Sequence, residues 1–201
     1  MKPNNIRAVL FDMDGVLIDS YEAWYELVRH GRAVLGGPGV TRESFRAGWG
    51  QGVDADVVTF FPSATIAAVE RYYEESFALY ASKVKVTPDA GPLLLELRHR
   101  GIKTAVISNT PGPLTRKILE ALDLKVDGVW GGGDAGRLKP APDLLLAACE
   151  TFQLQPAEAL MVGDSRFDQE AASAAAIRFA GFGREGDVSL ERLCQVLDLV
   201  G

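Results

Sequence analysis

The chain of 201 residues has few of the side chains that form disulfides or thiolate and imidazole metal sites. Its two cysteines, Cys149 and Cys194, each lie in an apolar stretch with a helical pattern, so we expect buried free thiols rather than a disulfide. Its two histidines, His30 and His99, have no nearby cysteine and no ligand-spaced partner, and we expect them at the surface or at helix ends. The sequence therefore argues against a Cys/His zinc site.

Long apolar runs and positive charge are also absent. No segment approaches the roughly 20 apolar residues that a membrane-spanning helix needs, and the first residues lead into a strand without a signal-peptide pattern. The formal net charge is −6 and no Lys/Arg cluster dominates a predicted face, which argues against a nucleic-acid partner. Apolar residues make up 47% of the chain, enough for a sizeable core. We therefore predict a cytoplasmic globular protein with no membrane partner, either a monomer or a homodimer.

The chain divides into a first part with helical patterns and a second part in which strands and helices alternate. Residues 8–11 form an apolar run typical of a buried strand. Residues 17–86 then show only helical patterns and glycine-rich loops, with helices expected at 20–35, 41–46 and 65–82. The remaining strands are expected at 103–107, 126–130, 159–162 and 177–180. The helices between and around these strands are expected at 90–100, 114–122, 143–152, 168–175 and 190–199.

This alternation implies helical crossovers and a parallel sheet. The first strand precedes the helical segment, and the other strands follow it. We therefore predict an α/β core formed by residues 1–16 and 87–201, with an all-helical domain of residues 17–86 inserted after the first strand.

Two aspartates close the first predicted strand, in the run Asp12-Met13-Asp14-Gly15. A strand places residues i and i+2 on the same side, so Asp12 and Asp14 can face one site. Two carboxylates so close raise each other's pKa or require a cation. One can then act as a nucleophile and the other as an acid/base, with a hard metal ion between them. On this segment alone, a solvated acidic turn is an equal alternative.

Polar residues also follow the later strands, where sites form in open parallel sheets. Ser108-Asn109 offers a hydroxyl and an amide at a helix start, which suits phosphate but is also a common capping cluster. Lys139 lies in the next loop, where a single lysine is usually solvated. Asp164 and Asp168 lie four residues apart at a helix start, which suits a hard metal ion, although one of them can simply cap the helix.

The order of these motifs along the chain is more specific than any one of them. It resembles the haloacid dehalogenase superfamily of phosphotransferases, and the match covers nearly the whole chain. The resemblance implies a Rossmann-like parallel-sheet core with an all-helical cap inserted after the first strand. The motif regions are Asp12-Met13-Asp14-Gly15-Val16, Ser108-Asn109, Lys139-Pro140, and Gly163-Asp164 with Asp168.

The resemblance implies a role for each catalytic candidate. Asp12 would attack phosphorus and form an aspartyl-phosphate. Asp14 would protonate the leaving oxygen and then deprotonate the water that hydrolyses the intermediate. Ser108 and Asn109 would bind the transferring phosphoryl oxygens, and Lys139 would offset charge on Asp12 and the phosphoryl group.

The resemblance also implies a Mg²⁺ site. Its ligands would be a carboxylate oxygen of Asp12, the backbone carbonyl of Asp14, and Asp164, with Asp168 binding directly or through water. Charge supports a metal independently, because two unit charges ~4 Å apart repel by roughly 4 kcal/mol at an effective dielectric near 20. Four such carboxylates could not meet a phosphate dianion without a divalent cation and a lysine. Oxygen ligands and a phosphate co-ligand favour Mg²⁺.

Within the superfamily, the chain is most similar to phosphoglycolate phosphatases. It shares Asp19-Ser20 after the first motif and a Gly-x-Gly loop at Gly50-Gln51-Gly52. It departs from them at Val16, where threonine is common. Sugar-phosphate phosphatases and β-phosphoglucomutase-like mutases are the alternatives, although the mutases carry a histidine where this chain has Trp24-Tyr25. The expected partner is a small phosphate ester.

The predicted cap would select the substrate. Arg42, Arg46, Trp49 and Gln51 are its candidate contacts, with Trp49 also a candidate for the core. Two hypotheses from other classes remain. A receiver domain also uses an early acidic pair and a lysine, but it has no helical insertion and no late Gly-Asp-x3-Asp. A catalytically inactive binding protein would lack some of the expected residue types, all of which are present.

Overall fold

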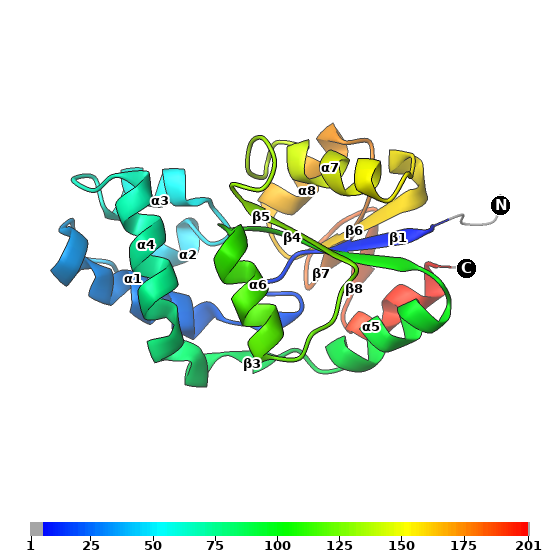
Figure 1. The fold of residues 1–201 in the computed structure, drawn as a ribbon, viewed down its shortest axis with the longest axis horizontal. Coiled ribbons are helices and arrows are strands. Elements are labelled where there is room, and N and C mark those ends of the chain that lie inside the picture. The colour runs from blue at the N-terminus through cyan, green and yellow to red at the C-terminus, as the bar shows by residue number, and fades with distance from the viewer. Residues whose placement is uncertain (1–5, 201) are drawn as a thin grey trace.

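The structure is a computed structural model that describes residues 6–200. Its centre is a six-stranded sheet in the order β5-β4-β1-β6-β7-β8, in which every neighbouring pair is parallel (Figure 1). The predicted α/β fold class is thereby confirmed. The strands are β1 (Ala8–Phe11), β4 (Lys103–Pro111), β5 (Gly128–Gly132), β6 (Ala159–Gly163), β7 (Arg178–Phe182) and β8 (Val188–Leu190).

Helices cover both faces of this sheet (Figure 1). One face carries α5 (Ala90–His99), α6 (Gly112–Ala121) and the 3-10 helix η3 (Leu193–Asp198). The other carries α7 (Asp143–Thr151) and α8 (Arg166–Ala174), and a short 3-10 helix η2 (Pro156–Glu158) leads into β6. When helices cover both faces of a parallel sheet, the side chains on both faces of each strand are buried and apolar. This is why β1 shows no alternation of polar and apolar residues.

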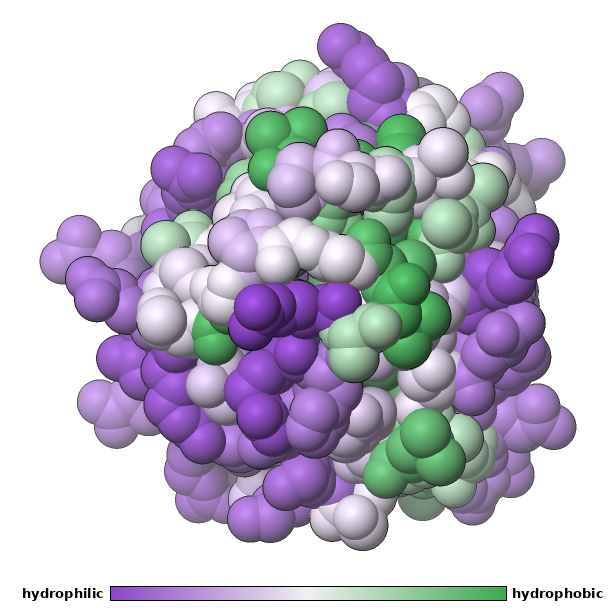
Figure 2. Space-filling model, turned by 90° about the vertical axis from the view of Figure 1, so that its left-hand side faces the viewer, coloured by the Kyte–Doolittle hydropathy of each residue, from purple (hydrophilic) through white to green (hydrophobic). Residues whose placement is uncertain are grey.

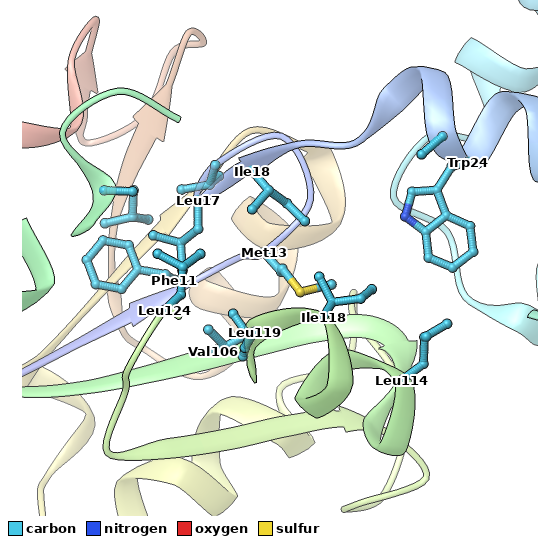
Figure 3. Packing of buried hydrophobic residues seen from close by; sticks show 14 of the residues in the cluster. Phe11, Met13, Leu17, Ile18, Trp24, Val106, Leu114, Ile118, Leu119 and Leu124 are labelled. Carbon is cyan, nitrogen blue, oxygen red and sulfur yellow. The ribbon is translucent and has the colours of Figure 1, made fainter. Parts of the chain in front are cut away.

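Strand β1 is the centre of the core. Val9 and Phe11 point into the apolar cluster beneath α5 and α6, whereas Leu10 points into the cluster beneath α7 and α8. Figure 3 shows Phe11 and Met13 among apolar side chains of β4 and α6. Because β1 pairs with β4 on one side and β6 on the other, residues that follow these three strands meet at one edge of the sheet.

Between β1 and α5 the chain forms a set of helices that we call the helical module, residues 21–83. It lies beyond the carboxyl ends of the strands, on the left of Figure 1. Figure 2 looks onto this end of the molecule and shows hydrophobic residues set among hydrophilic ones. The module consists of α1 (Tyr21–Leu35), α2 (Arg42–Ala47), α3 (Val53–Phe60), α4 (Ile66–Ser76) and the 3-10 helix η1 (Phe77–Lys83).

The local structure differs from the sequence-based prediction at several elements. Helix α3 was not predicted, because its eight residues follow a glycine-rich loop and are too short for a clear helical period. The helix predicted at 65–82 divides into α4 and η1. The segment predicted as a helix at 190–199 instead contains the last residue of β8 and then the 3-10 helix η3.

A two-stranded antiparallel ribbon joins the helical module to the core. Strand β2 (Ile18–Asp19) pairs with β3 (Lys85–Val86), which places the opposite charges of Asp19 and Lys85 side by side. The backbone N–H of Thr87 also donates to the carbonyl of Leu17 at 2.9 Å. Two-residue strands carry no readable pattern, so only helices were predicted in this part of the chain. The ribbon fixes the two points at which the chain leaves and re-enters the core.

The two cysteines form no disulfide, and His30 lies at the surface, as predicted. Cys149 is buried, Cys194 is partly buried, and both are free thiols. His30 contacts the Tyr80 hydroxyl on the surface of the helical module. No helix within residues 6–200 is long and apolar enough to cross a membrane.

Helix α5 offers a matched test of the core. Leu97 is fully buried, whereas Leu95 on the same helix is 54% exposed. We expect Leu97→Ala to lower the free energy of unfolding by about 2–5 kcal/mol, because it removes packed methyl groups and leaves a cavity. Leu95→Ala should change it by no more than about 0.5 kcal/mol. Urea unfolding followed by circular dichroism measures both, and equal losses in the two variants would contradict this packing.

Candidate active site

The predicted site residues converge where the sheet meets the helical module. Asp12 and Asp14 follow β1, Ser108 and Asn109 lie near the end of β4, and Lys139 comes from the loop after β5. All five line one pocket. The rest of its lining is Thr110 and Pro111 from β4, and Trp24, Val28, Phe45, Gly48, Trp49, Gly50, Gln51, Val53, Asp56 and Tyr73 from the helical module.

Lys139 is buried, and its ammonium group contacts three oxygen atoms. Its Nζ lies 3.0 Å from Asp12 Oδ1 and 2.6 Å from Asp168 Oδ1, and it donates to the carbonyl of Ile107 at 2.8 Å. Burial alone would lower the pKa of Lys139, but the two carboxylates outweigh burial and raise it above its usual range. The lysine therefore stays charged and holds the two aspartates together.

Asp12 has one oxygen held and one available. Its Oδ1 accepts from the backbone N–H of Met13 at 2.7 Å and faces Lys139, while Oδ2 has no protein donor within residues 6–200. Burial raises the pKa of Asp12, the negative charge of Asp168 raises it further, and Lys139 opposes both. The arrangement orients one carboxylate oxygen toward whatever enters the pocket.

Asp14 is held by three donors. Its Oδ1 accepts from Ser20 Oγ at 2.5 Å and Trp24 Nε1 at 2.9 Å, and its Oδ2 accepts from Thr110 Oγ1 at 3.0 Å. Burial raises its pKa, and the three hydrogen bonds counteract part of the rise. A carboxyl group with a raised pKa is suited to donate and accept a proton near neutral pH.

Two of the donors to Asp14, Ser20 and Trp24, were not predicted as site residues. Ser20 and Trp24 are four residues apart at the start of a predicted helix, so they share one face. That face lies directly after the Asp12-Met13-Asp14 motif, and this spacing is the signal that could have identified them. Trp24 belongs to α1, so the helical module contributes directly to the orientation of Asp14.

The side-chain amide of Asn109 is occupied by protein contacts. Its Nδ2 donates to the carbonyls of Gly50 and Lys139, at 2.9 and 2.8 Å, and its Oδ1 accepts from the backbone N–H of Lys139 at 2.8 Å. The amide is therefore occupied in linking the lysine loop to the helical module rather than turned to a phosphate. Ser108 is buried in the pocket lining, and its Oγ accepts from the backbone N–H of Thr110.

Three of the four predicted metal ligands form an acidic cluster. Carboxylate oxygens of Asp12, Asp164 and Asp168 all lie within 4.8 Å of one another, whereas the Asp14 side chain lies outside this cluster. Burial and the negative charge of Asp168 raise the pKa of Asp164 to about 6. Asp164 Oδ1 is buried and has no hydrogen-bond partner among the described residues 6–200. A buried carboxylate oxygen without a donor beside two further carboxylates fits a hard divalent cation.

Asp168 is committed to protein contacts. Its Oδ1 binds Lys139, and its Oδ2 accepts from the backbone N–H and the hydroxyl of Ser165, at 3.0 and 2.6 Å. Ser165 caps α8 and Asp168 completes the capping box. The helix start and the lysine thus share one buried carboxylate.

The predicted cap contacts divide into two groups. Trp49 and Gln51 line the pocket, and Trp49 Nε1 donates to Asp164 Oδ2 at 3.2 Å. Arg46 is exposed on α2 and is absent from the lining. Arg42 is also outside it, because it pairs with Glu22 and covers the Tyr25 ring. The two arginines therefore do not reach the pocket. The sequence did not indicate this, because a helix of six residues is too short for its buried face to be predicted from the residue pattern.

Asp56 is a pocket residue that sequence reasoning missed. It lies on the unpredicted helix α3, and its oxygens accept from Gln51 Nε2 at 2.7 Å and from the Tyr73 hydroxyl at 2.8 Å. No ion pair to it occurs within residues 6–200, and burial raises its pKa to about 6. A carboxylate that is kept ionised near neutral pH without a cation partner opposes folding, and such costs concentrate at functional sites.

The pKa of Asp56 predicts a pH-dependent stability difference. Because the folded-state pKa lies above the usual 3.8, the folded protein retains a proton that the unfolded chain has lost between pH 4 and 6. The cost is thus absent below pH 4 and complete above pH 6. We expect Asp56→Asn to raise the free energy of unfolding by about 1–3 kcal/mol at pH 7.5. Urea unfolding measures this, and the difference should shrink as the pH falls to 4.5; a constant difference would contradict it.

Comparison with known proteins places this geometry in a family. Residues 9–182 match the family model of haloacid dehalogenase-like hydrolases. A phosphoglycolate phosphatase of Photorhabdus laumondii subsp. laumondii is 31% identical over 180 residues, which cover 85% of this chain and 77% of that protein. A phosphoglycolate phosphatase of Aquifex aeolicus is 31% identical over 181 residues, which cover 87% and 84%.

A solved structure shares the fold. The crystal structure of a putative haloacid dehalogenase-like hydrolase from Bacteroides fragilis superposes with a TM-score of 0.83 at 24% identity, over 95% of this chain and 99% of that one. The matched residues 9–182 include the whole pocket lining and the acidic cluster described above. The chain belongs to the family of haloacid dehalogenase-like hydrolases.

Proposed function

We propose that this protein is a Mg²⁺-dependent phosphatase that hydrolyses a small phosphomonoester through an aspartyl-phosphate on Asp12. The observation that carries the proposal is the buried pair of Asp12 and Lys139, with Asp14 held by three donors in the same pocket. The relatives named phosphoglycolate phosphatase support this reaction class. We also propose that residues 17–86 act as a cap domain over a catalytic core of residues 1–16 and 87–201.

The reaction would proceed in two steps at the described residues. Asp12 Oδ2 attacks phosphorus and the ester oxygen leaves, taking the proton of Asp14. Asp14 then accepts a proton from water, whose oxygen attacks phosphorus and releases phosphate and Asp12. Lys139 offsets the negative charge on Asp12 throughout. Ser108, buried in the lining, supplies a hydroxyl for the phosphoryl oxygens.

Asp12 and Asp164 are the side chains best placed to hold the cation. Among residues 6–200, Asp164 Oδ1 lacks a donor, and a carboxylate oxygen of Asp12 lies in the same acidic cluster. Asp168 is occupied by Lys139 and Ser165, so we assign it chiefly to positioning the lysine. When bound, Mg²⁺ would neutralise charge on the phosphoryl oxygens and so permit an anionic nucleophile to approach them. The backbone carbonyl of Asp14 remains the predicted further ligand.

The other hypotheses have less support. A mutase must return a phosphoryl group to its substrate, and this chain has Trp24 where the mutases carry a histidine; Trp24 donates to Asp14 instead. A receiver-like function does not require a pocket lined by a helical module. A binding protein without catalysis would not need an acid and a nucleophile held so closely. A cytoplasmic location and the oligomeric state stay predictions.

Asp12→Asn tests the nucleophile. It preserves the shape of the side chain but removes the attacking anion, so Mg²⁺-dependent hydrolysis of p-nitrophenyl phosphate should fall at least about 10³-fold. Asp123→Asn is the matched control, because Asp123 is 83% exposed and outside the pocket lining. Acid-quenched protein should carry phosphate on the native chain only. Substantial turnover by Asp12→Asn would contradict the assignment.

Asp14→Asn tests the acid/base. We expect a large loss of kcat with an alkyl phosphate, whose leaving oxygen needs a proton, and a smaller loss in the first step with p-nitrophenyl phosphate. Single-turnover kinetics separate this step from breakdown of the intermediate. The same loss in the first step for both leaving groups would rule out proton donation by Asp14.

Gly15→Ala tests the metal site. Gly15 has φ +86°, and a Cβ there would lie 2.1 Å from Asp164 Oδ2, so alanine must displace that carboxylate. Gly133 has nearly the same φ, +87°, with nothing within 4 Å of a Cβ, so Gly133→Ala carries only the backbone strain. We expect Gly15→Ala to weaken Mg²⁺ binding by about 10–100-fold and Gly133→Ala to leave it unchanged. Calorimetric titration measures both, and equal effects would separate Asp164 from the metal.

A further inference from the structure

The part of the pocket lining that comes from the helical module has an unusual charge. Its lining from the helical module is mostly apolar and aromatic, and its one charged side chain is Asp56. Among residues 6–200, the lining contains one cationic side chain, Lys139, which is already paired with Asp12 and Asp168. Arg42 and Arg46 lie outside the lining. An anionic group on the leaving alcohol would therefore meet a negative wall and no free cation.

Asp56 is placed and oriented as a recognition group. Gln51 and Tyr73 each donate to one of its oxygens, which fixes the carboxylate plane at the pocket surface. A carboxylate can accept about four hydrogen bonds, so each oxygen retains a free acceptor position. The pKa of about 6 leaves the group mainly ionised at neutral pH.

We propose that the alcohol part of the substrate carries a hydrogen-bond donor, hydroxyl or ammonium, and no second anionic group, and that Asp56 selects it. The inference rests on the proposed phosphatase function, and it names the class of phosphomonoester that this pocket takes. Phosphoglycolate, whose alcohol part ends in a carboxylate, belongs to the disfavoured class. The name carried by the relatives thus need not describe the substrate of this chain.

Three esters of similar size test the selection: 2-phosphoglycolate, 2-hydroxyethyl phosphate and 2-aminoethyl phosphate. They end in a carboxylate, a hydroxyl and an ammonium group. We expect the native protein to show a kcat/KM at least about tenfold higher for one of the two donor esters than for phosphoglycolate. A drop in Asp56→Asn confined to the aminoethyl ester identifies an ammonium substrate, and a similar drop for both identifies a hydroxyl substrate.

The variants separate recognition from a structural role. Asp56→Asn should lower kcat/KM for the preferred donor ester by about 10–100-fold, mainly through KM, and raise it for phosphoglycolate. Asp54→Asn removes the same charge from an exposed position of the same helix outside the lining, and it should leave the ratio unchanged. A purely structural role would lower both activities together. Circular dichroism checks that each variant is folded.

Each outcome decides the matter. Preference for phosphoglycolate, equal turnover of the three esters, turnover of none of them, or an unchanged ratio in Asp56→Asn overturns the selection. If the variant does not fold, the ranking of the three esters by the native protein decides alone. Failure to hydrolyse p-nitrophenyl phosphate with Mg²⁺ present would instead overturn the proposed phosphatase function.

Discussion

The contact between the Lys139 ammonium and two buried carboxylates is the constraint on which the rest of the site depends. Burying Asp12 and Asp168 side by side is costly unless a cation lies between them. Lys139 meets both within 3.0 Å and also contacts the end of β4 through the Ile107 carbonyl. The lysine therefore connects the loop after β5 with β1, β4 and the start of α8, so one charge contacts four separate segments beside the pocket.

The helical module completes this arrangement. Trp24 holds Asp14, Trp49 donates to Asp164, and the Gly50 carbonyl accepts from Asn109. Each contact joins a module residue to a residue from a strand end of the core. The core alone would leave Asp14 with fewer donors and would open Asp164 to solvent. The chemistry proposed for the sheet edge is thus shared between both parts of the chain.

The core part of the site was predictable because strand ends are predictable. Buried apolar runs locate the strands, and in a parallel sheet Asp12, Asp164 and Lys139 must follow them at one edge. The sequence could not show that the amide of Asn109 would be occupied by Lys139 and Gly50, because those partners lie far away in the chain. Asp56 was missed, and Arg42 and Arg46 were predicted as contacts, because α2 and α3 are too short for the sequence to show which of their faces is buried.

The β2–β3 ribbon makes the helical module equivalent to a long hairpin loop. The chain leaves β1 and returns toward α5 at paired backbones, Ile18 beside Val86 and Asp19 beside Lys85. The sheet only requires these ends to meet, and the entropy of closing a loop grows slowly with its length. Helices of another number or size could span the same two points without moving β1 relative to β4. The fold therefore allows evolution to exchange the helical module while the residues at the sheet edge stay in place.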